Sequence, residues 1–135
     1  MYDLLFAERF QGRAYTPEDA AGFLRWGAAG WLAGTHFLFL ITTAAGKIVG
    51  AADIKSPDLA RAEVGYWMNA EHPGVMTNAV MKLCQIAQQA GYQSLVALTK
   101  AHNLKSAAVL ECAGFTYAAE CTRNEQPYRQ YTRNL

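Results

Sequence analysis

The residues with the clearest chemical potential lie where a predicted strand ends and a predicted helix begins. Gly74 stands at this junction, and the next four residues would supply the first backbone N–H groups of the helix: Val75, Met76, Thr77 and Asn78. A helix start offers unpaired donors and a partial positive charge, which together favour a phosphate group. The stretch has neither the GKS or GKT ending of a P-loop nor a GxGxxG fingerprint. The pattern alone therefore predicts an anion site without identifying the anion.

Three side chains elsewhere could take part in proton transfer or substrate binding. Ser106 lies one turn inside a short predicted helix that Asn103 can cap, so its hydroxyl could donate a proton or simply bond to the helix backbone. Glu63 lies on a predicted strand, where it could deprotonate an amine through water or form a surface salt bridge. Asp53 could line a substrate groove, although a solvated strand residue is the simpler interpretation.

Helices and strands alternate along most of the chain. Thr16 and Pro17 mark the start of a helix, and Gly34 marks its end. The strand–helix–strand unit from Glu63 to Thr99 implies a parallel, right-handed crossover. The sequence therefore predicts an α/β (α+β) fold with a mixed sheet. After the first helix we expect hairpin strands at 36–43 and 48–55, a strand at 61–68, a helix at 76–90, a strand at 95–99, a helix at 103–113, a strand at 115–121, a turn at 124–127 and a strand at 128–132.

The first predicted helix carries an apolar stripe that indicates which side packs on the sheet. Gly27 and Gly30 lower the helix propensity, and their place on or near the stripe predicts close packing against a sheet. Trp26 lies off the stripe, so we expect it to be partly exposed or covered by a partner. The stripe comprises Ala20, Phe23, Leu24, Gly27, Ala28, Trp31 and Leu32.

Length and composition indicate one domain that spans residues 1–135. Hydrophobic residues make up 52% of the chain and charged residues 17%, which argues against disorder. The net charge of +1 lacks the signature of a nucleic-acid binder, and the longest apolar run, 37–41, is too short to cross a membrane. The three cysteines form no CxxC pair, and no signal peptide is apparent. We therefore expect a cytoplasmic protein with reduced thiols and no metal site.

Four ordered motifs add a family resemblance to this picture. They lie at residues 46–50 (GKIVG), 62–68 (AEVGYWM), 74–80 (GVMTNAV) and 103–115 (NxxSxxVLExxGF). Together they resemble the GNAT acetyltransferase superfamily, and in particular its branch of ribosomal-protein N-terminal acetyltransferases. The resemblance covers residue 16 to the C-terminus. It implies a mostly antiparallel mixed sheet flanked by helices, in which the parallel strands 61–68 and 95–99 splay apart to form a cleft for acetyl-CoA.

The resemblance also implies roles for individual residues. The pantetheine arm of acetyl-CoA would lie along Trp67 and Met68, and its pyrophosphate would bind the N–H groups at 74–78. Asn103 and Ser106 match positions beside the pantetheine arm and the thioester, and Glu63 would lie beside the cleft as a candidate base. Acetyl-CoA would bind as a co-substrate without a metal, because uncharged donors at a helix start can hold a pyrophosphate.

Three features depart from the family pattern. The pyrophosphate loop, 71–74 (EHPG), is short, carries a negative charge and lacks one N–H donor at Pro73. Leu110 stands where many members have a tyrosine general acid, as in the ribosomal branch, where the serine that matches Ser106 could act instead. The family's first strand has no match, so the sheet would have an exposed edge or would be covered by another subunit.

The sequence therefore predicts an acetyl-CoA-dependent N-acetyltransferase in which a primary amine attacks the thioester directly. The acceptor could be a ribosomal-protein N-terminus, a polyamine, an antibiotic or another small amine. One alternative is a degenerate GNAT-fold binding or assembly module with weak or no CoA binding, and another is an unrelated α/β ligand-binding domain. We expect a homodimer without nucleic-acid or membrane partners, because residues 37–41 form an uncharged sheet edge near Trp26 and Trp31.

Overall fold

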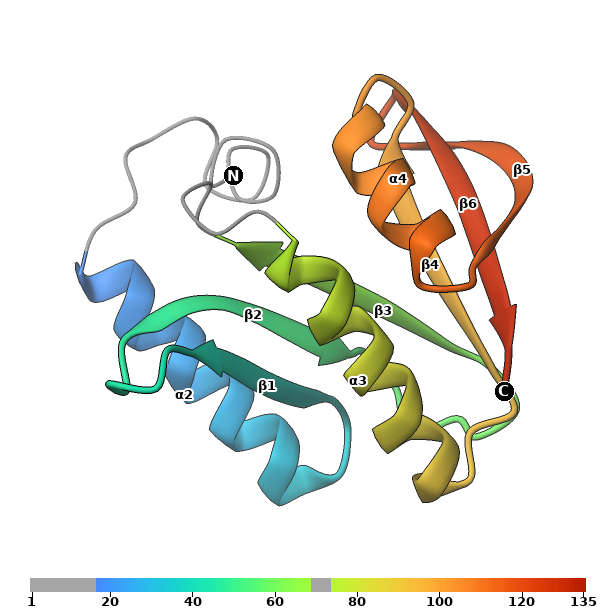
Figure 1. Cartoon of the computed structure of the whole chain (residues 1–135). Coiled ribbons are helices and arrows are strands. Elements are labelled where there is room, and N and C mark those ends of the chain that lie inside the picture. The colour runs from blue at the N-terminus through green and yellow to red at the C-terminus, as the bar shows by residue number, and fades with distance from the viewer. Residues whose placement is uncertain (1–16, 69–73) are drawn as a thin grey trace.

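The computed structural model describes residues 17–68 and 74–135, and its central feature is a six-stranded sheet with helices on both faces (Figure 1). The strands follow the order β1-β2-β3-β4-β6-β5 across the sheet. All neighbouring strands are antiparallel except β3 and β4, which are parallel. The predicted mixed sheet is therefore confirmed. The described elements are α2 (Pro17–Ala33), β1 (Phe37–Thr42), β2 (Ile48–Ile54), β3 (Ala62–Met68), α3 (Val75–Ala90), β4 (Ser94–Lys100), α4 (Leu104–Cys112), β5 (Thr116–Arg123) and β6 (Gln126–Asn134).

The helix ends follow from local sequence. Gly34 directly follows α2 and Gly91 directly follows α3, and both have a positive φ that glycine adopts without steric cost. Asn103 caps α4, because its side-chain oxygen accepts a hydrogen bond from the backbone N–H of Ser106 at 3.1 Å. These three ends confirm the predictions from the sequence. The predicted cap at Thr16 lies outside the described residues.

The last hairpin is tighter than the sequence indicated. The chain reverses at Asn124 and Glu125, whose φ values of 52° and 62° are those of a two-residue turn with both residues left-handed. Gln126 and Pro127 therefore already belong to β6, and the prediction of a turn over 124–127 was wrong. Such turns match the twist of the paired strands, which is why the ladder of β5 and β6 continues to Arg123↔Gln126.

Helix α2 covers one face of the sheet, whereas α3 and α4 cover the other (Figure 1). A Cβ at Gly27 would lie 2.3 Å from a Leu38 methyl group, so the predicted close packing of this helix is confirmed. The predicted apolar stripe is partly wrong, because Leu24 and Leu32 are exposed while Trp26 is half-buried. The ring of Trp26 stacks on His36, with centroids 4.0 Å apart.

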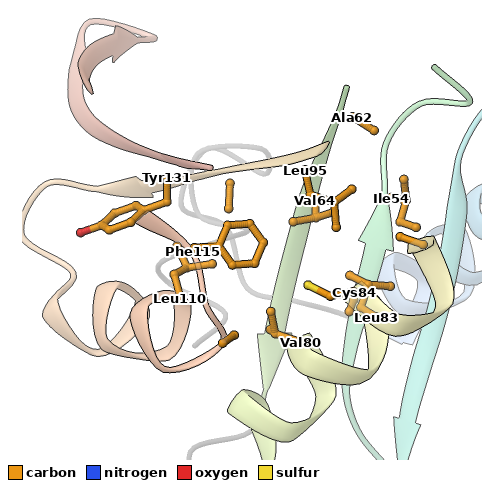
Figure 2. Close-up of a cluster of buried hydrophobic side chains, with 14 of the residues drawn as sticks. Ile54, Ala62, Val64, Val80, Leu83, Cys84, Leu95, Leu110, Phe115 and Tyr131 are labelled. Atoms are coloured by element: carbon orange, nitrogen blue, oxygen red, sulfur yellow. The ribbon is translucent and has the colours of Figure 1, made fainter. Parts of the chain in front are cut away.

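The hydrophobic core lies between the sheet and the pair α3 and α4 (Figure 2). Leu95 on β4 and Leu110 on α4 are both 0% exposed, and they belong to the same buried cluster. The cluster joins all the central elements, so it fixes the positions of α4 and of the strands that flank it. Its labelled members in Figure 2 are Ile54, Ala62, Val64, Val80, Leu83, Cys84, Leu95, Leu110, Phe115 and Tyr131.

Trp31 partly covers the outer edge of β1, which is an edge strand of the described sheet. Its indole N–H donates to the backbone carbonyl of Leu38 at 2.8 Å, and its ring contacts those of Phe37 and Phe39. The edge is thus satisfied in part by this chain's own helix. The expectation that the family's first strand is missing concerns residues 1–16, which lie outside the described residues.

Candidate active site

Strands β3 and β4 start side by side and then diverge, which opens the middle of the sheet (Figure 1). Their outer edges stay paired with β2 and β6, whereas residues 65–68 and 98–100 face the gap. The two strands therefore leave a gap between them beyond Val64 and Ala97. The predicted splayed pair is confirmed. The parallel pairing of β3 with β4 covers only Ala62↔Leu95, Glu63↔Val96 and Val64↔Ala97.

The gap opens into a cavity of about 370 Å³ that is lined from both faces of the sheet. Side chains alternate along a strand, so Glu63 and Trp67 lie on the α2 side of β3, while Tyr66 lies on the α4 side. Two molecules could therefore meet in the gap from opposite faces. The polar lining residues include Asp53, Lys55, Glu63 and Arg123 towards α2, and Tyr66, Thr99, Asn103 and Ser106 towards α4.

On the α4 side, the hydroxyls of Ser106 and Tyr66 are paired. Their oxygens lie 2.5 Å apart, and the Tyr66 hydroxyl also lies 3.2 Å from the Ser106 carbonyl. Burial raises the pKa of Tyr66 to about 12, although the hydrogen bond with Ser106 acts in the opposite direction. Tyr66 thus stays protonated at neutral pH and can hold the Ser106 hydroxyl in place.

Thr99 adds a third hydroxyl to this side of the cavity. It shares a face of β4 with Leu95 and Ala97, which pack in the core under α3 and α4. Thr99 is 5% exposed, yet its hydroxyl has no hydrogen-bond partner among residues 17–68 and 74–135. A buried hydroxyl is normally paired. Its position in the cavity therefore fits a polar group of a ligand that lies along β4.

On the α2 side, Asp53 and Lys55 form an ion pair above Gly65. The Lys55 Nζ lies 3.1 Å and 3.3 Å from the two carboxylate oxygens of Asp53. A Cβ at Gly65 would come within 2.9 Å of Asp53 Oδ1, so the pair occupies the space that glycine leaves. Burial raises the pKa of Asp53, while Lys55 acts to lower it. Asp53 is 7% exposed, so the interpretation as a solvated strand residue was wrong.

Glu63 forms a second ion pair across the cavity. Its Oε1 lies 2.8 Å from an Nη of Arg123 on β5, and the two side chains are 25% and 47% exposed. A pair this exposed contributes little to stability. It does hold Glu63 at the cavity wall, two residues before the point where β3 leaves β4.

Aromatic rings line the α2 end of the cavity. Phe23 stacks on Trp26 with centroids 5.7 Å apart, and it meets Trp67 edge-on at 6.4 Å. All three residues line the cavity, whereas Trp31 does not. Trp26 was expected to be partly exposed or covered by a partner, and it is half-buried as part of this wall.

The structure brings together only some of the residues predicted to bind the cofactor. Trp67, Asn103 and Ser106 line the cavity together with Glu63. Met68 is the last residue of β3, and its backbone lies at the gap. The residues at the start of α3 do not line the cavity, and the loop before them, 69–73, lies outside the described residues. The residues in question are Gly74, Val75, Met76, Thr77 and Asn78.

Three polar residues of the cavity were missed or left as packing groups by the sequence analysis. Tyr66 was interpreted as a packing residue, and the forty-residue separation from Ser106 hides their contact. Arg123 is sixty residues from Glu63, so no local pattern indicates that pair. Lys55 could have been found, because residues two apart on a strand share a face and it follows Asp53 at that spacing.

Within residues 17–68 and 74–135, no group of three or more His, Cys, Asp or Glu residues is arranged to hold a metal ion. No helix of this part of the chain is long and apolar enough to cross a membrane. Cys84, Cys112 and Cys121 are free thiols.

Comparisons with solved structures match this fold to acetyltransferases. The microcin C7 self-immunity acetyltransferase MccE, in complex with acetyl-CoA and AMP, matches with a TM-score of 0.77 and 24% identity over 87% of this chain and 71% of that one. The ribosomal-protein-S5-alanine acetyltransferase from Vibrio fischeri matches with a TM-score of 0.75 and 22% identity over 90% and 75% of the two chains. RimL, a ribosomal L7/L12 α-N-protein acetyltransferase in complex with CoA, matches with a TM-score of 0.76 and 18% identity over 89% and 73%.

The family comparison is independent of these structures. No curated protein matches the chain. The profile of the family described as "Acetyltransferase (GNAT) domain" matches residues 4–116, which is most of the sequence. The splayed strands β3 and β4, the capped α4 and the motifs they carry lie within these matched residues. The chain therefore belongs to the GNAT acetyltransferase family.

Proposed function

We propose that this protein transfers the acetyl group of acetyl-CoA to a primary amine. The observation that carries the proposal is the cavity between β3 and β4, which is open to ligands from both faces of the sheet. Acetyl-CoA would enter from the side of α4, and the amine would enter from the side of α2. The reacting atoms would then meet in the gap without a covalent enzyme intermediate. The proposed location is the cytoplasm, where free thiols stay reduced.

The residues on the α4 side fit the acyl donor. The pantetheine arm would follow the backbone of Trp67 and Met68, with its polar groups near Asn103 and the unpaired hydroxyl of Thr99. When the amine nitrogen attacks the thioester carbonyl, the C–S bond breaks and a thiolate leaves. Ser106 would donate a proton to this thiolate, and the hydrogen bond with Tyr66 would keep the hydroxyl aimed.

The residues on the α2 side fit the acceptor. The amine arrives as an ammonium ion and must lose a proton before its nitrogen can attack. We propose that Glu63 receives this proton through a water molecule, because it lies at the cavity wall on the same face as Gly65 and Trp67. Its ion pair with Arg123 holds the carboxylate at this position on the wall.

A binding or assembly module without catalysis is the second candidate function. It is favoured by the position of Gly74 and the start of α3, which do not line the cavity. The two candidates differ in a direct measurement. Calorimetry with acetyl-CoA, followed by release of free thiol in the presence of a primary amine, should show both binding and turnover for the enzyme and neither for the module.

Changing Gly74 to aspartate should weaken acetyl-CoA binding by about tenfold or more, because the new carboxylate would repel the pyrophosphate. Gly74 has a φ of +83° and open space where a Cβ would lie. Aspartate and asparagine both tolerate this backbone conformation, so Gly74→Asn is the matched neutral control. Calorimetry in the presence of a chelator measures both. Equal affinities for the two variants, or a requirement for a divalent cation, would contradict the proposed pyrophosphate site.

We also propose a homodimer that forms around α2 and β1. Leu32 is 91% exposed, Leu24 and Leu40 are each 42% exposed, and the edge of β1 is only partly covered by Trp31. A two-fold pairing would bury this apolar surface. Sedimentation at micromolar concentration should give twice the monomer mass for the wild type and the mass of a single monomer for Leu32→Glu. A wild-type protein that sediments as a monomer contradicts the dimer.

A further inference from the structure

The ion pair between Asp53 and Lys55 indicates what kind of ligand the α2 side of the cavity binds. Lys55 Nζ is a primary alkylammonium ion, and both oxygens of Asp53 lie within 3.3 Å of it. The Asp53 side chain is 9% exposed, whereas that of Lys55 is 42% exposed. Lys55 can therefore swing its charge into water at little cost, but Asp53 cannot.

Asp53 also lies at the point where the strands part. It pairs across the ladder with Gly65, which directly follows the last residue of β3 paired with β4. The missing side chain at Gly65 leaves its carboxylate room above the gap. Glu63 lies farther back, where β3 and β4 are still paired, and its carboxylate is held by Arg123. Of the two carboxylates in the cavity, Asp53 is thus nearer to the gap and the more deeply buried.

The surroundings of Asp53 fit an organic ammonium ion. The charged groups that line the same cavity are Lys55 on β2, Glu63 on β3, Lys100 on β4 and Arg123 on β5. Helix α2 itself contributes the rings of Phe23 and Trp26 to this lining and no charged side chain. These rings give the carbon chain of an organic ammonium ion an apolar wall, while Asp53 supplies the opposite charge.

We propose that Asp53 binds the ammonium group of the acceptor, and that Lys55 occupies this position until the acceptor displaces it. This inference rests on the proposed acetyl transfer to a primary amine. The exchange replaces one ammonium ion on Asp53 by another, so the charge of the buried site does not change. The bound ammonium then passes one proton through water to Glu63, and its nitrogen attacks the thioester. As the amide forms, this nitrogen loses a second proton, which replaces the one that Ser106 gives to the departing thiolate. Lys55 is released towards solvent and returns when the neutral amide product leaves.

The indole N–H signals of the three tryptophans in an NMR spectrum provide the test. Trp26 and Trp67 line the cavity and Trp31 does not, so Trp31 is an internal control. Titration of the wild type with n-butylamine at pH 8 should shift the signals of Trp26 and Trp67 and leave that of Trp31 in place. Alaninamide serves as a second probe, which distinguishes a peptide N-terminus from a simple alkylamine.

Two substitutions should move the affinity in opposite directions. Asp53→Asn should weaken binding of the probe by about tenfold or more, because the buried carboxylate is lost. Lys55→Met should tighten binding, because the internal competitor is lost. Glu63→Gln removes a carboxylate from the same cavity and should weaken binding far less than Asp53→Asn. A purely structural ion pair would instead give weaker binding for both Asp53→Asn and Lys55→Met.

The outcomes separate this inference from the proposed function. If Lys55→Met weakens binding, or if Asp53→Asn leaves it unchanged, the assignment of Asp53 is overturned even when the wild type transfers acetyl groups. If the wild type binds the amine as expected but does not bind acetyl-CoA, the proposed function fails while the ammonium site stands. The Trp31 signal and a thermal melt report whether each variant is folded. If Asp53→Asn does not fold, the response of Lys55→Met decides the assignment.

Discussion

Replacing Ser106 by alanine should lower the rate of acetyl transfer by about 10²–10⁴-fold, the usual contribution of a general acid. The affinity for acetyl-CoA should stay within about twofold of wild type, because the backbone N–H of residue 106 still bonds to the cap at Asn103. Calorimetry and steady-state kinetics measure the two quantities separately. A rate within about twofold of wild type would mean that Ser106 is only a helix hydroxyl bonded to its neighbours.

Tyr66→Phe is the partner variant of this experiment. It removes the hydroxyl that lies 2.5 Å from Ser106 Oγ and keeps the ring that packs against the core. We expect a rate loss smaller than that of Ser106→Ala, because Tyr66 positions the acid and does not touch the thiolate. Since burial raises the pKa of Tyr66 to about 12, it stays protonated, and the loss should be constant between about pH 6 and 9. A loss that grows with pH in this range would contradict the positioning role.

The parts of the fold that were predictable are those with local causes. Glycine at 34 and 91 ends a helix because few other residues adopt a positive φ, and Asn103 starts one because its side chain binds a backbone N–H. The splayed pair was predicted in a different way, through the family resemblance that the four motifs carry. The helix-end signals each need only a few neighbouring residues.

The parts that were not predictable depend on contacts between distant segments. The hydroxyl pair of Tyr66 and Ser106 exists because α4 packs over β3, and nothing within either segment encodes that contact. The ring of Trp26 stacks on that of His36, ten residues later in the chain, which a stripe of apolar residues does not reveal. Asp53 is buried because Gly65 on the neighbouring strand leaves space for it. The register of β2 with β3 therefore decides its environment.

Substitutions of two leucines on β4 should distinguish the half of the strand that packs in the core from the half that lines the cavity. Leu95 lies where β4 pairs with β3 and is 0% exposed, so Leu95→Ala should lower the free energy of unfolding by about 2–5 kcal/mol. Leu98 lies in the splayed half, is half-buried and lines the cavity. Leu98→Ala removes the same atoms and should cost under about 2 kcal/mol.

The same two variants should differ in the opposite direction in their affinity for ligands. Folded Leu95→Ala should bind acetyl-CoA and n-butylamine much as the wild type does, because its side chain lies in the core under α3 and α4. Leu98→Ala should weaken at least one of the two ligands, because it enlarges the cavity in which they meet. Urea unfolding and calorimetry provide the two measurements. Equal losses of stability would mean that the splayed half of β4 is as tightly packed as the paired half, and the gap could not then open for both substrates.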